Sequence, residues 1–224
     1  VPLFEAYGMT ENCAYATSNS PENIKIGTVG IPAHGVELKL ADDGEILIRS
    51  GGVFKGYFKD DQATSETIDK DGWLHTGDVG IYEGDFVKII DRKRDIIITS
   101  GGKNVSPSEI ENKIKVSPFI KEAIVIGDRR KFLSVLIGIE FDTVSNWALR
   151  KNIPHTTYRD LSEKQEVKDL VWKEISRANE LTSSLEVREF RMIPKELDHE
   201  EGELTATQKV KRNVLIDQFS DLIE

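Results

Sequence analysis

Four short polar motifs carry the side chains of this chain that could do chemistry. The first is Tyr7-Gly8-Met9-Thr10-Glu11, which sets a hydroxyl beside a carboxylate after a flexible glycine. Because Mg²⁺ prefers hard oxygen ligands, Thr10 and Glu11 could hold a phosphate oxygen and a Mg²⁺ ion together. Thr and Glu are also ordinary residues at the start of a helix, so the pentapeptide alone fits a plain turn as well.

The second motif is Trp73-Leu74-His75-Thr76-Gly77-Asp78, which ends in an acidic residue. A carboxylate held by a glycine turn suits the two hydroxyls of a ribose, as in dinucleotide-binding sites. A surface aspartate in a turn fits the same pattern equally well.

The third motif is the charged run Asp91-Arg92-Lys93-Arg94-Asp95, which is followed by an apolar stretch and by Gly101-Gly102-Lys103. Residues 86–104 hold five basic and two acidic side chains, within a chain whose net charge is −9. A basic pocket in an acidic protein favours an anionic small ligand over a polyanion. A solvated, charged connector is the alternative interpretation.

The fourth motif is the segment 204–212, where small and polar residues surround Lys209. A lysine at the tip of such a loop can enter a neighbouring site as a point charge. Most loop lysines are solvated, so this segment predicts little without the other three motifs.

The elements that must position these motifs change in character along the chain. Fourteen of the 17 glycines lie at or before Gly102, which predicts tight turns and short strands in the first part. Asp43-Gly44 separates two alternating runs and predicts a hairpin at 36–49. Further strands are expected at 86–90 and 96–99.

After residue 102 the chain becomes a mixture of helices and strands. Ser106-Pro107-Ser108-Glu109 is a capping box that predicts a helix to about Lys115. Strands are expected at 123–126, 133–139 and 188–193. A long helix is expected at 162–181, capped by Ser162 and Gln165, and a short one at 212–223. The predicted fold class is α/β and α+β: a β-rich subdomain followed by a small α+β domain.

Composition excludes several classes of protein. The chain has 224 residues, and its acidity argues against a general nucleic-acid binder. Its single cysteine, Cys13, excludes an intrachain disulfide and fits a reducing compartment. No run of about 18 apolar residues and no signal peptide is visible. We therefore expect a cytoplasmic protein. The absence of an initial Met suggests a truncated chain.

In this order, the motifs together resemble the AMP-forming acyl-CoA synthetase superfamily, which also holds luciferases and nonribosomal adenylation domains. The resemblance runs through the whole chain. It includes Gly-Glu-Ile-x-Ile-Arg-x-x-Gly-Val-x-x-Gly-Tyr at 44–57, His-Thr-Gly-Asp at 75–78 and Asp-Arg-x-x-Asp at 91–95. Residues 97–105 and the helix expected at 162–181 are most similar to the long-chain fatty acid–CoA ligases.

The resemblance implies a two-step reaction in which Mg·ATP activates a fatty acid to an acyl-adenylate, and the acyl group then passes to the thiol of coenzyme A. Both reactants of the first step are anions, so a cation must offset the charge that grows at the α-phosphate. Lys209 matches the family's adenylation lysine. Thr10 and Glu11 match the phosphate- and Mg²⁺-binding pair, with Glu11 as the metal ligand.

The nucleotide-binding residues implied by the resemblance lie in the first three motifs. Tyr7 matches the aromatic residue that lies against adenine, with Gly8 beside it. Asp78 and Arg92 match the partners of the ribose hydroxyls.

The resemblance also implies a mobile C-terminal domain. Arg94 matches the hinge about which that domain turns between adenylation and thioester formation. In the second pose Gly101, Gly102 and Lys103 would face the coenzyme A arm. Glycine there lets the pantetheine pass close to the backbone.

The main departure from the family is the lack of a Ser/Thr/Gly-rich phosphate loop before Tyr7. We therefore expect residues 1–93 to be the end of the large adenylation domain and 94–224 to be the mobile domain. The chain by itself is expected to be inactive. A fatty acyl-AMP ligase that transfers to a carrier-protein thiol, and a non-catalytic nucleotide-binding relative, remain alternatives. Fatty acid and coenzyme A are the expected partners, without nucleic acid. Peripheral contact with the inner membrane face through the missing part and the oligomeric state stay open.

Overall fold

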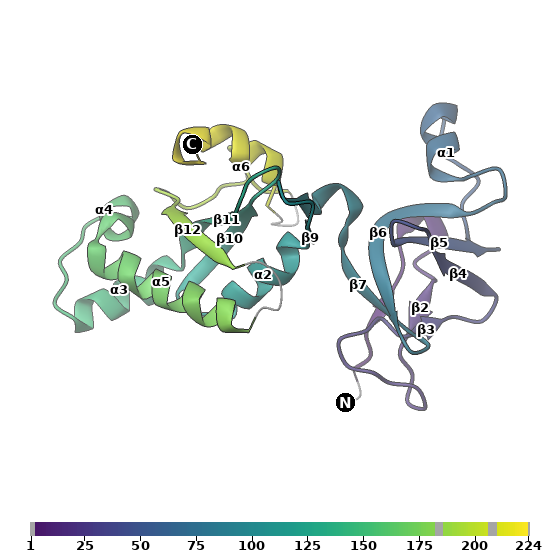
Figure 1. Ribbon diagram of the computed structural model, residues 1–224, viewed down its shortest axis with the longest axis horizontal. Helices are drawn as coiled ribbons and strands as arrows, with labels where there is room; N and C mark the ends of the chain where they lie inside the picture. The colour runs from purple at the N-terminus through teal and green to yellow at the C-terminus, as the bar shows by residue number, and fades with distance from the viewer. Residues whose placement is uncertain (1–2, 182–185, 206–209, 224) are drawn as a thin grey trace. The chain divides into compact units, whose positions relative to one another are not determined.

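The computed structural model describes residues 3–181, 186–205 and 210–223. The chain divides into two compact units, Val1–Ile96 and Ile97–Glu224. Figure 1 labels the elements of both units. Each unit has its own hydrophobic core, so each is described separately.

The first unit consists mainly of antiparallel strands in two sheets. A small sheet has the order β1 (Ala6–Tyr7), β2 (Thr17–Ser18), β3 (Ile31–Pro32). The larger sheet follows chain order: β4 (Val36–Leu40), β5 (Glu45–Ser50), β6 (Leu74–Glu83), β7 (Phe86–Arg92). Three short helices accompany these strands: the 3₁₀ helices η1 (Thr10–Asn12) and η2 (Lys93–Asp95), and α1 (Asp61–Thr67).

The hairpin expected at 36–49 is confirmed as β4 and β5, which pair antiparallel from Val36↔Ser50 to Leu40↔Ile46. Gly44 closes the turn at φ +82, a backbone conformation that L side chains rarely adopt. Alternate side chains of these strands then enter the core of the unit, where Ile46 and Ile48 are fully buried with Leu74 and Val87.

The second unit is built on a mixed three-stranded sheet, β10 (Ile120–Ile126), β11 (Leu133–Ile139) and β12 (Val187–Met192). β10 and β11 are antiparallel, whereas β11 and β12 are parallel. A two-stranded ladder, β8 (Ile97–Ile98) and β9 (Asn104–Val105), opens the unit. Its helices are α2 (Pro107–Ile114), α3 (Phe141–Arg150), α4 (Tyr158–Glu163), α5 (Gln165–Glu180), α6 (Arg212–Gln218) and α7 (Ser220–Ile223).

Both faces of this sheet are covered (Figure 1). Ala123 and Val125 belong to the larger apolar cluster, which includes residues of α2, α3, α4 and α5. Ile124 and Ile126 point the other way, into a cluster with Leu215 of α6. Burial on both faces explains why residues 123–126 of β10 and 135–137 of β11 are continuous apolar runs rather than alternating ones.

Two of the expected helices are wrong in outline. The helix predicted at 162–181 is present as α5 but begins only at Gln165, because the chain is extended at Lys164, with φ −63 and ψ 136. Ser162 therefore lies in the last turn of α4 instead of capping α5, and its hydroxyl donates to the Arg159 carbonyl at 2.9 Å. α4 is capped by Thr157, whose hydroxyl accepts the Asp160 N–H, whereas the N-cap of α5 is Lys164, which makes no side-chain cap hydrogen bond.

The final predicted helix is likewise interrupted at Phe219, which separates α6 from α7. The cap at Ser106 is confirmed, since its hydroxyl accepts the Glu109 N–H at 3.2 Å. Within the described ranges, no helix is long and apolar enough to cross a membrane.

Candidate nucleotide-binding site

Three of the sequence-predicted residues form one hydrogen-bonded cluster in the first unit. The Tyr7 hydroxyl donates to Asp78 Oδ2 at 2.5 Å. Arg92 Nε lies 2.9 Å from Asp78 Oδ1, so both carboxylate oxygens have a partner. Asp78 itself is only 6% exposed, whereas Arg92 is exposed. The cluster thus presents a fixed carboxylate and an accessible guanidinium side by side.

An interruption in the pairing of β5 with β6 determines where Asp78 lies in the sheet. β5 and β6 pair at Glu45↔Val79 and again at Leu47↔His75, so the single residue Ile46 lies opposite three residues of β6. Residues 76–78, two more than β5 has at this point, form a bulge in β6. Such bulges re-aim side chains and are frequent beside active sites. Asp78 in turn pairs directly with Arg92 across the β6–β7 ladder.

The electrostatics of the cluster favour a protonated phenol. Burial of Tyr7 raises its pKa above the usual value, and the hydrogen bond to the Asp78 carboxylate raises it further. Deprotonation would set two anions 2.5 Å apart, so the phenol remains a hydrogen-bond donor at neutral pH.

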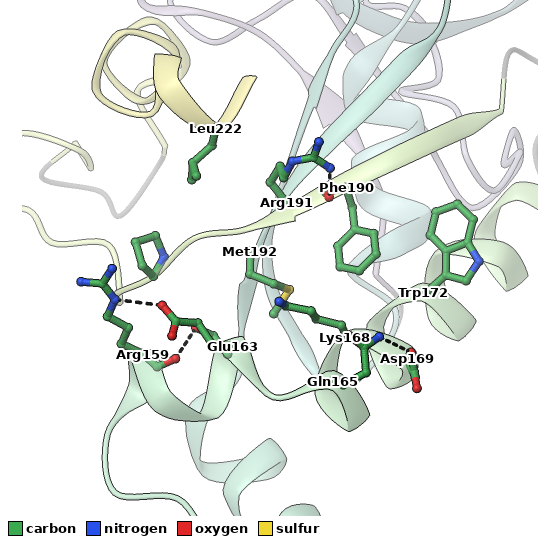
Figure 2. A pocket seen from close by; sticks show the side chains of 12 residues that line it. Arg159, Glu163, Gln165, Lys168, Asp169, Trp172, Phe190, Arg191, Met192 and Leu222 are labelled. Carbon is green, nitrogen blue, oxygen red and sulfur yellow. Dashed lines mark hydrogen bonds and ion pairs between the residues drawn. The ribbon is translucent and has the colours of Figure 1, made fainter. Parts of the chain in front are cut away.

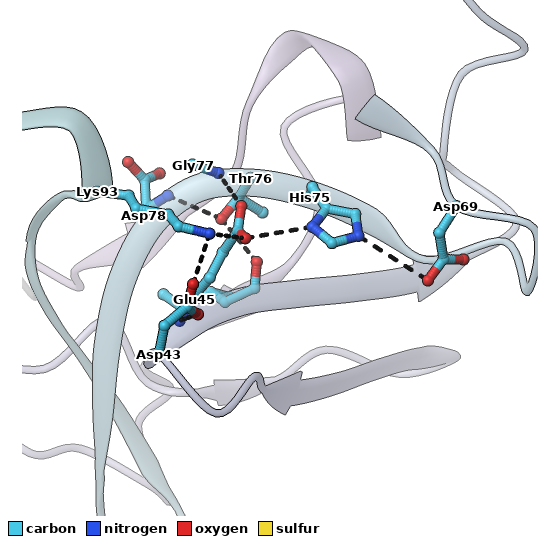
Figure 3. Close-up of polar contacts among 9 residues, drawn as sticks. Asp43, Glu45, Asp69, His75, Thr76, Gly77, Asp78 and Lys93 are labelled. Atoms are coloured by element: carbon cyan, nitrogen blue, oxygen red, sulfur yellow. Dashed lines mark hydrogen bonds and ion pairs between the residues drawn. The ribbon is translucent and has the colours of Figure 1, made fainter. Parts of the chain in front are cut away.

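A second polar network lies next to this cluster and was not found from the sequence (Figure 3). Glu45, 5% exposed, accepts the Gly77 N–H at 2.9 Å and the Lys93 ammonium at 2.9 Å. His75 Nδ1 lies 3.2 Å from the same carboxylate, and Lys93 also contacts Asp43 at 2.6 Å. Burial alone would raise the pKa of Glu45, but these donors outweigh it and hold the pKa below its usual value.

Glu11 and Thr10 are not members of the Asp78 cluster. Both are in η1, where Glu11 Oε1 accepts the Tyr57 hydroxyl at 2.8 Å. The residues that the structure describes contain no group of three or more His, Cys, Asp or Glu that could hold a metal. One carboxylate beside a hydroxyl still fits Mg²⁺, because that ion is usually held by one or two carboxylates together with substrate phosphates and water.

The predicted thioester-face residues form a tight turn in the second unit. The Thr99 N–H donates to the Lys103 carbonyl, and the Gly102 N–H donates to the Thr99 carbonyl, which closes the loop between β8 and β9. Gly102 has φ +75. Gly101, Gly102 and Lys103 are all exposed, so the turn presents its backbone to solvent.

Lys209 lies outside the described residues. The residues on either side of that segment are described, and Leu204 and Val210 form an antiparallel bridge. Beyond Val210, Arg212 Nη2 lies 2.7 Å from Glu111 of α2, and its Nη1 donates to the Val125 carbonyl of β10. The predicted hinge residue Arg94 is in η2, with its side chain largely exposed.

A cavity of about 490 Å³ lies in the second unit between α5 and β12 (Figure 2). The Trp172 and Phe190 rings stack 5.8 Å apart at one side of it. Lys168 and Met192 line the cavity near them. None of the sequence-predicted site residues that the structure describes lines this cavity.

Comparison with known proteins gives the chain a family. Residues 94–224 match the family model described as the AMP-binding enzyme C-terminal domain, and residues 1–58 match that of the AMP-binding enzyme. The first match alone covers more than half of the chain. This chain belongs to the AMP-binding enzyme family. The family resemblance inferred from the ordered motifs is therefore confirmed.

Curated members of this family align along almost the whole chain. A long-chain-fatty-acid–CoA ligase of Mycobacterium bovis is 38% identical over 225 residues, which cover 99% of this chain and 37% of that protein. Long-chain-fatty-acid–CoA ligase 6 of Mus musculus is 35% identical over 239 residues, covering 99% of this chain and 34% of that protein. The chain thus spans little more than a third of these relatives.

Solved structures of AMP-binding enzymes share the fold. O-succinylbenzoate coenzyme A synthetase from Bacillus subtilis, in complex with AMP, superposes with a TM-score of 0.67 at 26% identity, over 96% of this chain and 40% of that one. The adenylation domain of a carboxylate reductase from Mycobacterium chelonae gives a TM-score of 0.74 at 22% identity, over 98% and 34%. The predicted fold class, that of the C-terminal portion of adenylate-forming enzymes, is confirmed.

Proposed function

We propose that this chain is the C-terminal portion of a long-chain fatty acid–CoA ligase. The observation that carries the proposal is the Tyr7–Asp78–Arg92 cluster, which joins three motifs that lie far apart in the sequence. The alignment with named ligases along 99% of the chain supports the fatty acid as substrate. The ligase would form acyl-AMP with release of pyrophosphate, and then an acyl-CoA thioester.

The cluster suits the nucleoside part of ATP. The Asp78 carboxylate can accept hydrogen bonds from ribose hydroxyls, and the exposed Arg92 guanidinium adds donors beside it. Tyr7 supplies an aromatic ring next to them for the adenine. Thr10 and Glu11 would hold the phosphates and Mg²⁺, which neutralises phosphate charge during the displacement. Lys209 would offset the charge that grows at the α-phosphate.

We assign residues 1–93 to the end of the large adenylation domain and 94–224 to the mobile domain. The family match that begins at residue 94 and the division of the chain after Ile96 support this boundary. Arg94 would be the hinge. The exposed turn at 101–103 would approach the coenzyme A arm in the thioester-forming pose, where its glycine backbone leaves room for the pantetheine.

The test is an assay of pyrophosphate release with ATP, palmitate and coenzyme A. The full-length protein that contains this chain should turn over and yield palmitoyl-CoA, whereas the 224-residue chain alone should not, because it has no phosphate loop. Release of pyrophosphate with transfer only to a carrier-protein thiol would overturn the assignment of coenzyme A. Robust turnover by the chain alone would overturn its assignment as a partial site.

A further inference from the structure

We propose that Glu45 is a positioning residue that holds Asp78 and Arg92 in the geometry needed to bind ribose. This inference rests on the proposed function, because it assumes that those two residues contact the nucleotide. Glu45 lies at the first position of β5 and is almost fully buried. Its two oxygens contact the residue immediately before Asp78 and the residue immediately after Arg92 (Figure 3).

The contact on the Asp78 side supports the bulge. Because β6 has three residues opposite Ile46, the ladder with β5 is interrupted over this segment. Glu45 Oε1 accepts the Gly77 N–H at 2.9 Å, and the Thr76 hydroxyl donates to the Ile46 carbonyl at 2.7 Å. Side-chain groups thus replace the missing ladder bonds. Gly77, at φ +70, takes the backbone conformation that the bulge requires.

The contact on the Arg92 side is an ion pair. Glu45 Oε2 lies 2.9 Å from the ammonium of Lys93, which also lies 2.6 Å from Asp43. Lys93 opens η2 and directly precedes Arg94, the proposed hinge residue. The carboxylates of Glu45 and Asp43 therefore hold Lys93 in place directly after Arg92, the last residue of β7.

A carboxylate suits this position because two of the groups that it contacts can only donate. Gly77 N–H and the Lys93 ammonium have no acceptor lone pair to offer. A glutamine amide could keep the Gly77 bond through its oxygen, but its NH₂ would then face the Lys93 ammonium. We expect Glu45→Gln to release Lys93 and to loosen the bulge without removing any group that touches the nucleotide.

The experiment compares ATP with 2′,3′-dideoxy-ATP in the adenylation reaction of the full-length protein. The wild type should prefer ATP, because only ATP offers ribose hydroxyls to Asp78 and Arg92. Glu45→Gln should reduce this preference at least tenfold through a higher KM for ATP, with kcat/KM for dideoxy-ATP within about twofold of wild type. Lys93→Met should shift the preference in the same direction by a smaller factor.

Glu37→Gln is the matched control, because Glu37 of β4 forms an exposed ion pair with Arg49 of β5, the strand that also carries Glu45. It should leave both nucleotides unaffected. An equal loss with ATP and dideoxy-ATP in Glu45→Gln and Lys93→Met would show a merely structural role and overturn the inference. An unchanged preference in both variants would also overturn it. Absence of any adenylation by the wild type would instead refute the proposed function.

Discussion

Replacing Tyr7 by Phe isolates the contribution of one hydroxyl to the Tyr7–Asp78–Arg92 cluster. The hydroxyl is 2.5 Å from Asp78 Oδ2, and Asp78 has little access to water that could replace it. Hydrogen bonds to charged groups contribute about 1.5–3 kcal/mol to stability. Tyr7 is only half-buried and Asp78 keeps its Arg92 partner, so we expect a loss of about 1.5 kcal/mol in the free energy of unfolding of the first unit.

The assay is urea unfolding followed by tryptophan fluorescence. Trp73 lies in the first unit, whereas Trp147 and Trp172 lie in the second, so a Trp147→Phe/Trp172→Phe background reports the first unit alone. Tyr82→Phe is the matched control, because its hydroxyl donates to a neutral, exposed carbonyl, that of Leu38, at 3.1 Å. We expect that control to change the free energy by less than about 0.5 kcal/mol.

The effect of Tyr7→Phe should also depend on pH in a defined direction. The pKa of Tyr7 in the folded protein is raised above its ordinary value near 10, first by burial and then by Asp78. A raised pKa means that the hydroxyl stabilises the fold fully below about pH 10 and loses this effect as pH rises further. The difference between wild type and variant should therefore be constant from pH 7 to 10 and shrink above. A Tyr7→Phe loss no larger than that of Tyr82→Phe, or one that grows above pH 10, would refute the reasoning.

Three further predictions concern packing and ion pairs. Glu111→Gln should lower the free energy of unfolding of the second unit by about 2 kcal/mol, because it leaves the mostly buried Arg212 without its carboxylate. Urea unfolding measures this loss, and a change under about 0.5 kcal/mol would contradict the prediction. Gly30→Ala should destabilise the first unit by more than about 3 kcal/mol, since its Cβ would lie 1.9 Å from the Ser18 carbonyl carbon. Gly35→Ala, at a similar φ of +77 but in open space, should cost only about 1 kcal/mol, and equal losses at the two glycines would refute the steric argument.

The sequence predicted those elements whose signals come from residues close together in the chain. The β4–β5 hairpin follows from Asp43-Gly44 between two alternating runs, and the start of α2 follows from its serine cap. The break between α4 and α5 was missed because Ser162 and Gln165 have the spacing of a capping box, although Ser162 lies in α4 and its hydroxyl donates to the Arg159 carbonyl. Only the extended backbone at Lys164 separates the two helices.

The candidate site was predictable in residue type but not in architecture. The ordered motifs singled out Tyr7, Asp78 and Arg92, and the structure brings these three together. The role of Glu45 was missed, because its partners lie 32 and 48 residues away and depend on a bulge that no local pattern encodes. Its place in the Gly-Glu-Ile motif was one available signal. A polar residue at the start of a buried strand, before three apolar residues, could have marked it as a structural carboxylate.

The central claim is that this chain supplies the adenylation lysine and the mobile domain of a fatty acid–CoA ligase. The most direct test measures the two half-reactions separately in the full-length protein carrying Lys209→Ala. The proposed function predicts that formation of palmitoyl-AMP from ATP and palmitate falls by several orders of magnitude, while transfer from preformed palmitoyl-AMP to coenzyme A stays close to wild type. An equal loss in both half-reactions, or full retention of adenylation, would contradict the claim.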